Sequence, residues 1–269
     1  HFGAGLSFLY EFGHHIDNQS FKPLIYAKYT REFIDFRFGS FPNEYMFTFP
    51  EVLRTDTFQY YHSNCEGAYL ELKQKWGSQS VWVDWLSKQT ASDREIFQIG
   101  GSGIIKKGVF FYRHDFIMTH YAHSANRPPD SYLRDNGGLL ASLGADMSDF
   151  LFDSLTITTG YTMSYDRIRG RSGIEFRHGS MTKIYIGLSG FAIRESIYLG
   201  NGQLQLWGDK LYGAEYYYRT DLIWHFFNRK YIKGSLEFSV HLVESDLDFS
   251  QSITINANLP SPEIKIQGR

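Results

Sequence analysis

Residues 155–166 read LTITTGYTMSYD, and this stretch decides the fold class. Its odd positions include the apolar or aromatic Leu155, Ile157 and Tyr161, whereas its even positions are small or polar, as at Thr158 and Asp166. Successive side chains of a β-strand point to opposite faces, so this alternation predicts a two-faced strand.

The same alternation recurs along the whole chain. In segment 232–242 it gives an unbroken apolar row, for which we predict contact with lipid: Ile232, Leu236, Phe238, Val240 and Leu242. We count about 14 such segments, with boundaries good to a few residues. They are 2–13, 21–31, 33–40, 64–75, 79–88, 94–105, 108–122, 136–146, 151–166, 172–178, 181–194, 211–226, 229–244 and 249–259.

The connections between these segments fall into two sizes. Very short ones occur at Arg31–Glu32 and Asn228–Arg229, and long ones at 41–63, 123–135 and 195–210. Short turns at one end and long loops at the other are typical of membrane β-barrels. No stretch of convincing length shows the helical period.

Strand length and closure favour a membrane barrel over a soluble fold. Many segments run to about 10–15 residues, whereas strands of soluble proteins average about 5–6 and a bilayer needs about 9–11. One soluble barrel of this size would leave a lumen that side chains cannot fill. We therefore predict an all-β, closed antiparallel transmembrane β-barrel of about 14 strands (range about 12–16). It spans 1–259, with a C-terminal tail at 260–269. The alternative fold is a soluble secreted β-sandwich or propeller.

The composition fits a barrel and excludes other classes. Aromatic residues make up 17% of the 269 residues, with 19 Tyr and 23 Phe, yet mean hydropathy is -0.34. The net charge of -2 argues against nucleic acid as a partner. Cys65 stands alone, so no disulfide framework is expected. No secretory signal is visible at the start, which suggests a processed or trimmed chain.

Two stretches carry a family resemblance. Residues 33–42 read FIDFRFGSFP, and residues 81–85 read VWVDW, followed by QTASDRE at 89–95. Over most of its length, the chain resembles large outer-membrane barrels of the Bacteroidota type in its general sequence pattern, without a diagnostic motif. The resemblance implies a bacterial outer-membrane location, outer-membrane lipid as a partner, and other outer-membrane proteins or lipoproteins as further partners. Many such barrels end in an aromatic residue, and here the chain continues past Leu259 to Arg269.

The polar face of the predicted strands carries both charge signs in near balance. We expect a salt-bridged, hydrated wall, in preference to a filter selecting one sign. Across neighbouring strands, Glu215, Arg219, Lys233 and Glu237 should pair. The predicted lumen-lining residues are Asp35, Arg37, Glu71, Lys73, Lys75, Asp84, Asp166, Glu175, Arg177, Lys183, Glu215, Arg219, Asp221, Lys233 and Glu237.

Segment 41–63 is longer than ordinary connections, which points to a functional role. It could fold into the lumen as a constriction, or it could pack on its own aromatic residues as an outer loop. Its constriction candidates are aromatic: Tyr45, Phe47, Phe49, Phe58, Tyr60 and Tyr61.

No group of residues in the sequence gives a strong indication of a catalytic or metal-binding site. His120, His123 and Ser124 invite comparison with a barrel phospholipase, but adjacent strand residues face opposite ways, and His120 and Ser124 would lie about 13 Å apart. His14, His15 and Asp17 are expected to be solvated, because zinc sites usually need more ligands. Asp135–Gly138 is interpreted as a turn. No catalytic residue, metal or cofactor is expected.

Three functions remain open. The first is porin-like passage of small polar solutes with weak charge selectivity, through a lumen narrowed by segment 41–63. The second is a non-conducting structural subunit of an outer-membrane complex for barrel assembly or lipoprotein export. The third is a hydrolase of the phospholipase type. The sequence favours the first, so the chain is not expected to be an enzyme.

Overall fold

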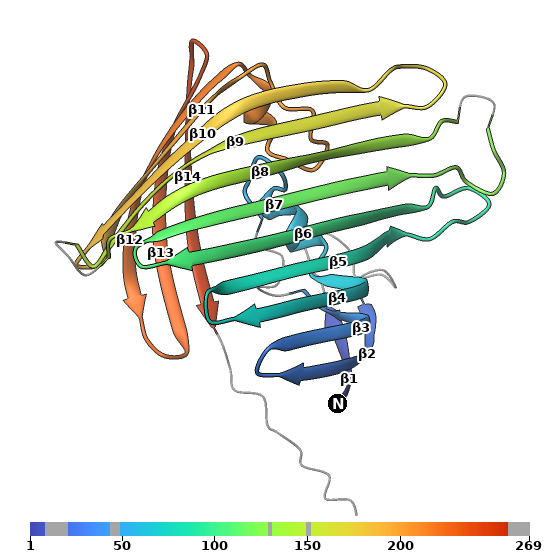
Figure 1. The fold of residues 1–269 in the computed structure, drawn as a ribbon, viewed down its shortest axis with the longest axis horizontal. Coiled ribbons are helices and arrows are strands. Elements are labelled where there is room, and N and C mark those ends of the chain that lie inside the picture. The colour runs from blue at the N-terminus through green and yellow to red at the C-terminus, as the bar shows by residue number, and fades with distance from the viewer. Residues whose placement is uncertain (9–20, 44–48, 129–130, 149–151, 258–269) are drawn as a thin grey trace, which may run out of the picture.

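The chain folds into one 14-stranded antiparallel sheet, whose strands pair in chain order from β1 to β14 (Figure 1). The computed structural model describes residues 1–8, 21–43, 49–128, 131–148 and 152–257. The predicted all-β fold of about 14 antiparallel strands is confirmed, and closure between β1 and β14 stays a prediction. The strands are β1 (Phe2–Phe8), β2 (Phe21–Arg31), β3 (Ile34–Pro42), β4 (Asn64–Gln74), β5 (Gly77–Ser87), β6 (Ile96–Lys107), β7 (Phe110–Tyr121), β8 (Arg134–Asp146), β9 (Ser154–Ile168), β10 (Glu175–Leu188), β11 (Phe191–Gly200), β12 (Tyr216–Asn228), β13 (Ile232–Val243) and β14 (Asp246–Ala257).

The two ends of the sheet differ in their connections. At the short-turn end, β6–β7 and β10–β11 are joined by two residues each, and β12–β13 by three. At the opposite long-loop end lie the connections 43–63, 122–133 and 201–215. The predicted division into short turns and long loops therefore holds.

The strand boundaries around β10, β11 and β12 were predicted wrongly: the predicted strand 211–226 begins in a short helix, and β12 begins at Tyr216. Segments 172–178 and 181–194 were interpreted as two strands, followed by a loop at 195–210. The structure instead has one strand, β10, through Gly179, and a tight turn at Ser189 and Gly190, where φ is 53° and 84°. The strand β11 then begins within the predicted strand 181–194 and runs into the predicted loop as far as Gly200. The turn was missed because Ser189 takes the left-handed conformation, which is uncommon for a residue with a side chain.

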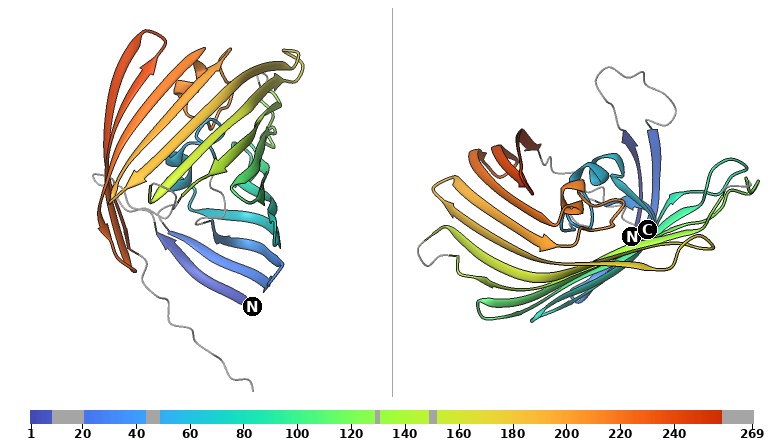
Figure 2. Two further views of the ribbon diagram at one scale, coloured as in Figure 1. Left: turned by 60° about the vertical axis from the view of Figure 1, so that its left-hand side comes forward. Right: turned by 90° about the horizontal axis from the view of Figure 1, so that it is seen from above.

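Two of the long connections fold back against the concave face of the sheet (Figure 2). The first carries the helix α1 (Asp56–Tyr61), and the second carries the short helix η2 (Lys210–Gly213). We call 49–62 and 201–213 the inserted segments. With wall residues they form the main buried core: Phe41, Phe49, Val52, Leu53, Cys65, Tyr69, Trp82, Ile117, Leu140, Met181, Tyr198, Tyr212 and Tyr217.

Polar contacts fix the second inserted segment to the wall. The fully buried amide of Asn136 on β8 donates to the carbonyl of Leu204 at 2.8 Å and accepts from the backbone of Leu206 at 3.1 Å. The hydroxyl of Ser164 on β9 accepts from the backbone of Leu204 at 2.8 Å. These side chains therefore define the inner face of their strands.

A buried arginine holds the first inserted segment. The Arg54 guanidinium lies 5.0 Å from the Phe49 ring, 5.1 Å from Phe58 and 5.6 Å from Trp82 of β5. Burial lowers the pKa of Arg54 to about 10, so it stays charged at neutral pH. Such cation–π contacts are strongest when they are desolvated.

The outer face carries the apolar residues of each strand. On β13, Ile232, Leu236 and Phe238 are exposed on the outer face. The next residue, Ser239, is buried on the inner face. Val240 and Leu242 share the outer face and are half-buried. Their predicted contact with lipid stays a prediction. In the described part of the chain, no helix is long and apolar enough to span a membrane.

We expect Leu53→Ala to destabilise the fold, because Leu53 is fully buried between an inserted segment and the wall. Removing a leucine side chain from such a site costs about 2–5 kcal/mol. Urea unfolding of the reconstituted protein measures the change. The exposed Thr57→Ala on the same segment is the control and should change stability by less than about 0.5 kcal/mol. Equal effects of the two changes would mean that the segment does not pack on the wall.

Candidate active site

A histidine and an aspartate meet across two neighbouring strands at the long-loop end. His120 on β7 lies directly opposite Asp135 on β8 in the strand register. The His120 Nδ1 is 2.6 Å from the Asp135 Oδ1. A carboxylate at this distance orients the imidazole and favours the tautomer with a proton on Nδ1.

Arg169 completes the cluster from the far side of Asp135. It follows β9 directly, and its Nε donates to the Asp135 Oδ2 at 2.7 Å. The backbone N–H of Arg169 also donates to the carbonyl of Leu133 at 2.9 Å, which fixes the start of the β9–β10 connection. The hydrogen bond to Asp135 raises the pKa of the Arg169 guanidinium above its usual value. Both oxygens of Asp135 are therefore engaged, one by each partner.

The cluster lies on the outer face of the sheet. Thr119 and Asn136, the sequence neighbours of His120 and Asp135, are buried on the inner side, where Thr119 contacts Gln98 and Asn136 contacts an inserted segment. Adjacent strand residues face opposite ways. His120 and Asp135 therefore face outward.

Aromatic side chains border the cluster on the same outer face. The Phe97 ring centroid lies 5.1 Å from that of His120, and the Trp85 ring lies 5.9 Å from Phe97. Trp85 is 44% exposed, and its indole N–H donates to the Glu95 carboxylate at 3.1 Å. A rim of this kind, apolar with a polar edge, is typical of side chains at a membrane–water interface.

The connection after β7 is braced by neighbouring residues. The Arg94 guanidinium donates to the carbonyl of Ala122 at 2.9 Å and also to that of Tyr132. The Gln89 amide donates to the carbonyl of His123 at 2.8 Å. These contacts tie both ends of the 122–133 connection to the β5–β6 connection, so the rim around His120 is well defined.

The hydroxyl that the sequence suggested is not available to His120. Ser124 is buried, and its Oγ donates to the carbonyl of Asn126 at 3.0 Å. Within the described residues, His120 has Asp135 as its hydrogen-bond partner and forms no hydrogen bond with a hydroxyl group. The arrangement suits a base that activates water, and it does not form a serine–histidine pair.

The predicted lumen-lining residues mostly share the inner face and pair with one another. Asp35 and Arg37 are 3.2 Å apart, and Glu71 and Lys73 are 3.3 Å apart. Further ion pairs join Asp166 to Arg134 and Glu175 to Arg177, while Asp84 accepts from the backbone of Glu66. The register also places Lys183 and Lys233 on this face. Lys75 and Glu215 lie outside the strands, in connections.

Of the four residues expected to form ion pairs across strands, Arg219 and Glu237 do so. The Arg219 Nη2 donates to the Glu237 Oε1 at 2.8 Å. Glu215 instead contacts Glu244 through its backbone N–H, and Lys233 has no ion pair among the described residues. A lumen-lining role for the whole set stays a prediction.

The described part of the proposed constriction segment, residues 49–62, lies against the concave face. Phe49 packs edge-on against Trp82 at 5.8 Å, and Phe58 packs against Trp207 at 4.9 Å. Tyr61 is exposed. Tyr45, Phe47 and the Tyr60 side chain lie outside the described residues, as do His14, His15, Asp17 and the tail at 260–269. In the described residues, no group of three or more His, Cys, Asp or Glu side chains could hold a metal ion.

Sequence reasoning missed Asp135 because residues 135–138 resemble a turn. The structure places all four in β8. The glycines are needed for packing: a Cβ at Gly137 would lie 2.6 Å from the Tyr165 ring, and one at Gly138 would lie 2.5 Å from the Gln205 amide. His120 and Asp135 are 15 residues apart. Only the register of β7 and β8 could have shown that they meet.

The fold and the site together define a large antiparallel β-sheet protein with a histidine–aspartate pair on the outer face of its sheet. Residues 1–262 match the family model described as lipid A 3'-O-deacylase-type, and the chain therefore belongs to that family. No curated protein and no solved structure matches the chain. The family and the large antiparallel sheet are consistent with an outer-membrane barrel.

The family assignment corrects the expected function. A deacylase family is a family of enzymes, so the predicted porin-like passage of solutes is wrong, as is the expectation of a non-enzyme. The alternative of a non-conducting structural subunit is wrong for the same reason. The sequence misled because strand alternation is compatible with a channel and with an enzyme, and because only the strand register brings His120 and Asp135 together.

We expect Asp135→Asn to release the His120 imidazole from its single tautomer. An amide cannot hold the Nδ1 proton as a carboxylate does, and it loses the ion pair with Arg169. Nitrogen NMR of labelled histidine should show Nδ1 protonated in the parent protein and a mixture of tautomers in the variant. Asp146→Asn, at the other end of β8, should leave the His120 signal unchanged. An unchanged signal in Asp135→Asn would show that the pair does not form.

Proposed function

We propose that this protein is an outer-membrane ester hydrolase that removes an acyl chain from a lipid A-type glycolipid, with His120 as its general base. The observation that carries the proposal is the position of the His120–Asp135 pair on the outer wall at the long-loop end. A substrate anchored in the outer leaflet could reach this pair sideways, without entering the barrel. The family description makes the ester at the 3' oxygen the expected target.

The outer face supports a membrane setting for the site. Most strands are 10–15 residues long, enough to cross a bilayer when tilted. At the short-turn end the rings of Phe191 and Trp224 stack at 6.1 Å, and at the long-loop end Trp85 is exposed near His120. Two aromatic levels on one outer face resemble the girdles of membrane barrels. His120 would then lie at the headgroup level of the outer leaflet.

The mechanism follows from the tautomer of His120. With its Nδ1–H donated to Asp135, the Nε2 lone pair can take a proton from water as that water attacks the ester carbonyl. The resulting tetrahedral intermediate collapses, and the sugar oxygen leaves with the proton returned from Nε2. The products are a free fatty acid and a sugar hydroxyl, so one water molecule is consumed.

The role of Asp135 is to position and stabilise the histidine. Its carboxylate accepts a hydrogen bond from the Nδ1–H and compensates the charge that the imidazole gains in the transition state. Arg169 holds the second oxygen of Asp135, and Arg171 lies over the Tyr132 ring at 4.8 Å. These two cations lie after β9 at the same end of the sheet, where they would attract an anionic headgroup.

Localisation in a bacterial outer membrane is part of the same proposal. It is supported by the outward apolar rows and by the substrate class in the family description. Outer-membrane lipid would be both solvent and substrate. The likeness to Bacteroidota-type barrels remains a prediction from residues 33–42 and 81–95.

We expect His120→Gln to lower kcat for fatty-acid release by about 10²–10⁴-fold, because glutamine cannot accept the proton from water. The assay incubates the purified protein with lipid A in mixed micelles and measures released fatty acid by mass spectrometry. His114→Gln is the matched control, since His114 lies on the outer face of the same strand near its other end. The control should keep the parent rate. Equal rates in both variants would remove His120 from the mechanism.

A further inference from the structure

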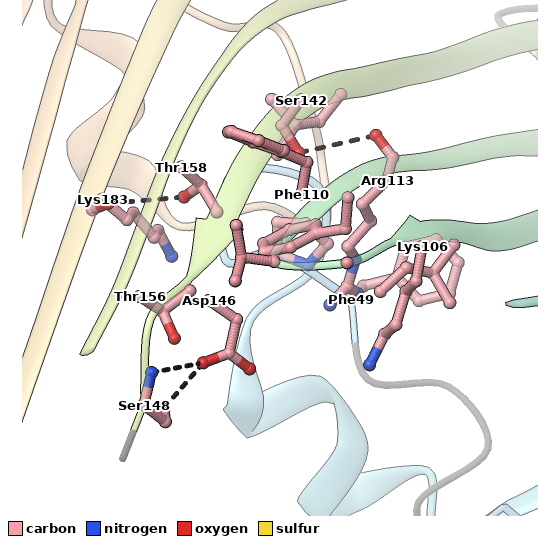
Figure 3. A pocket seen from close by; sticks show the side chains of 16 residues that line it. Phe49, Lys106, Phe110, Arg113, Ser142, Asp146, Ser148, Thr156, Thr158 and Lys183 are labelled. Carbon is pink, nitrogen blue, oxygen red and sulfur yellow. Dashed lines mark hydrogen bonds between the residues drawn. The ribbon is translucent and has the colours of Figure 1, made fainter. Parts of the chain in front are cut away.

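A cavity of about 720 Å³ lies on the inner face, at the opposite end of the sheet from His120 (Figure 3). It reaches the short-turn end, where Gly108 and Val109 of the β6–β7 turn line it. Phe49 of the first inserted segment also lines it. The cavity is thus bounded by the sheet and an inserted segment, and it shares no residue with the candidate active site.

Cations outnumber anions around this cavity. Lys106, Arg113 and Lys183 line it together with one carboxylate, Asp146. Asp146 already accepts from the Ser148 backbone at 3.2 Å and from the Ser148 hydroxyl at 2.6 Å. The lining therefore has a surplus of positive charge.

Two of the cations have no direct ion-pair partner among the described residues, although the Lys106 charge acts on Asp146. In the described part of the chain, the ammonium groups of Lys106 and Lys183 form no hydrogen bond or ion pair, whereas Arg113 is paired with Asp115 at 2.8 Å. The carboxylate whose charge acts on Lys183 is that of Glu51, which is paired with Arg219 at 3.1 Å. Lys106 is exposed and Lys183 is half-buried. An anion in this space would give the Lys183 ammonium group a direct partner, and would therefore be stabilised.

The remaining lining suits an organic anion. Figure 3 shows Lys183 reaching in from β10 on the side of Thr156 and Thr158, whose hydroxyls can donate to an acceptor. Phe49, Phe111 and Leu140 provide an apolar wall. Pockets of about 300–1,000 Å³ with mainly apolar walls and a few polar groups are typical of small-molecule sites.

We propose that this cavity is a binding site for a small organic anion, in which a carboxylate or phosphate group meets Lys183 and Lys106 and an apolar body packs against Phe49 and Leu140. The inference is independent of the proposed deacylase activity, because the cavity lies on the other face and at the other end of the wall.

Ligand-observed NMR on the protein in nanodiscs tests the proposal, with empty nanodiscs as the baseline. The probes are hexanoate and hexyl phosphate, with hexylammonium as the cation of matched shape. We expect saturable binding of at least one anion and none of hexylammonium above baseline. Binding of only one anion identifies the carboxylate or the phosphate as the preferred group.

Variants locate the site. Lys183→Met should weaken anion binding at least 10-fold, while Lys183→Arg should retain it. Lys233→Met, an inner-face lysine that does not line the cavity, should bind like the parent protein. Folding of each variant is checked by its heat-dependent migration on a gel. The proposal is overturned if neither anion binds, if hexylammonium binds as tightly, or if folded Lys183→Met binds as the parent protein does.

Discussion

The two-residue period of the β-strand is the constraint on which the rest of this structure depends. Each strand residue must face either the inserted segments or the outside. On β8 this rule sends Asn136 inward to hold the backbone of Leu204 and Leu206, and it sends Asp135 outward to His120. Packing and chemistry are thereby separated on the two faces of one wall. A shift of one residue in register would exchange them.

The inner face shows how a wide sheet keeps its interior ordered. Arg219 donates to Asp221 at 2.6 Å, to Glu237 at 2.8 Å and to Glu51 of the first inserted segment at 3.1 Å. Arg194 joins the same two wall carboxylates. A buried charge is costly unless it is paired, and here every carboxylate of the network has a guanidinium partner. The network therefore fixes where the inserted segment sits as well as compensating charge.

Much of the fold could be predicted from the sequence, because alternation marks each strand without knowledge of its neighbours. The rows at 155–166 and 232–242 correspond to β9 and β13, and the total of 14 strands follows from such rows. The turn at Ser189 and Gly190 was missed because these residues are not the asparagine–glycine pair that most clearly marks a two-residue hairpin turn. The candidate site was harder still. His120 and Asp135 meet only through strand register, and Asp135 lay in a glycine-rich stretch that resembled a turn. The porin interpretation failed because strand alternation and a balanced polar face do not distinguish a channel from an enzyme built on the same fold.

The central claim is that substrate meets the protein on its outer wall and not within the barrel. Photo-crosslinking tests it most directly, with benzoylphenylalanine placed either at Phe97, beside His120 on the outer face, or at Thr156, in the inner cavity. The two proteins are reconstituted with lipid A, irradiated and analysed by mass spectrometry. The account predicts a lipid A adduct at position 97 and none at position 156. An adduct at position 156 without one at position 97 would contradict it.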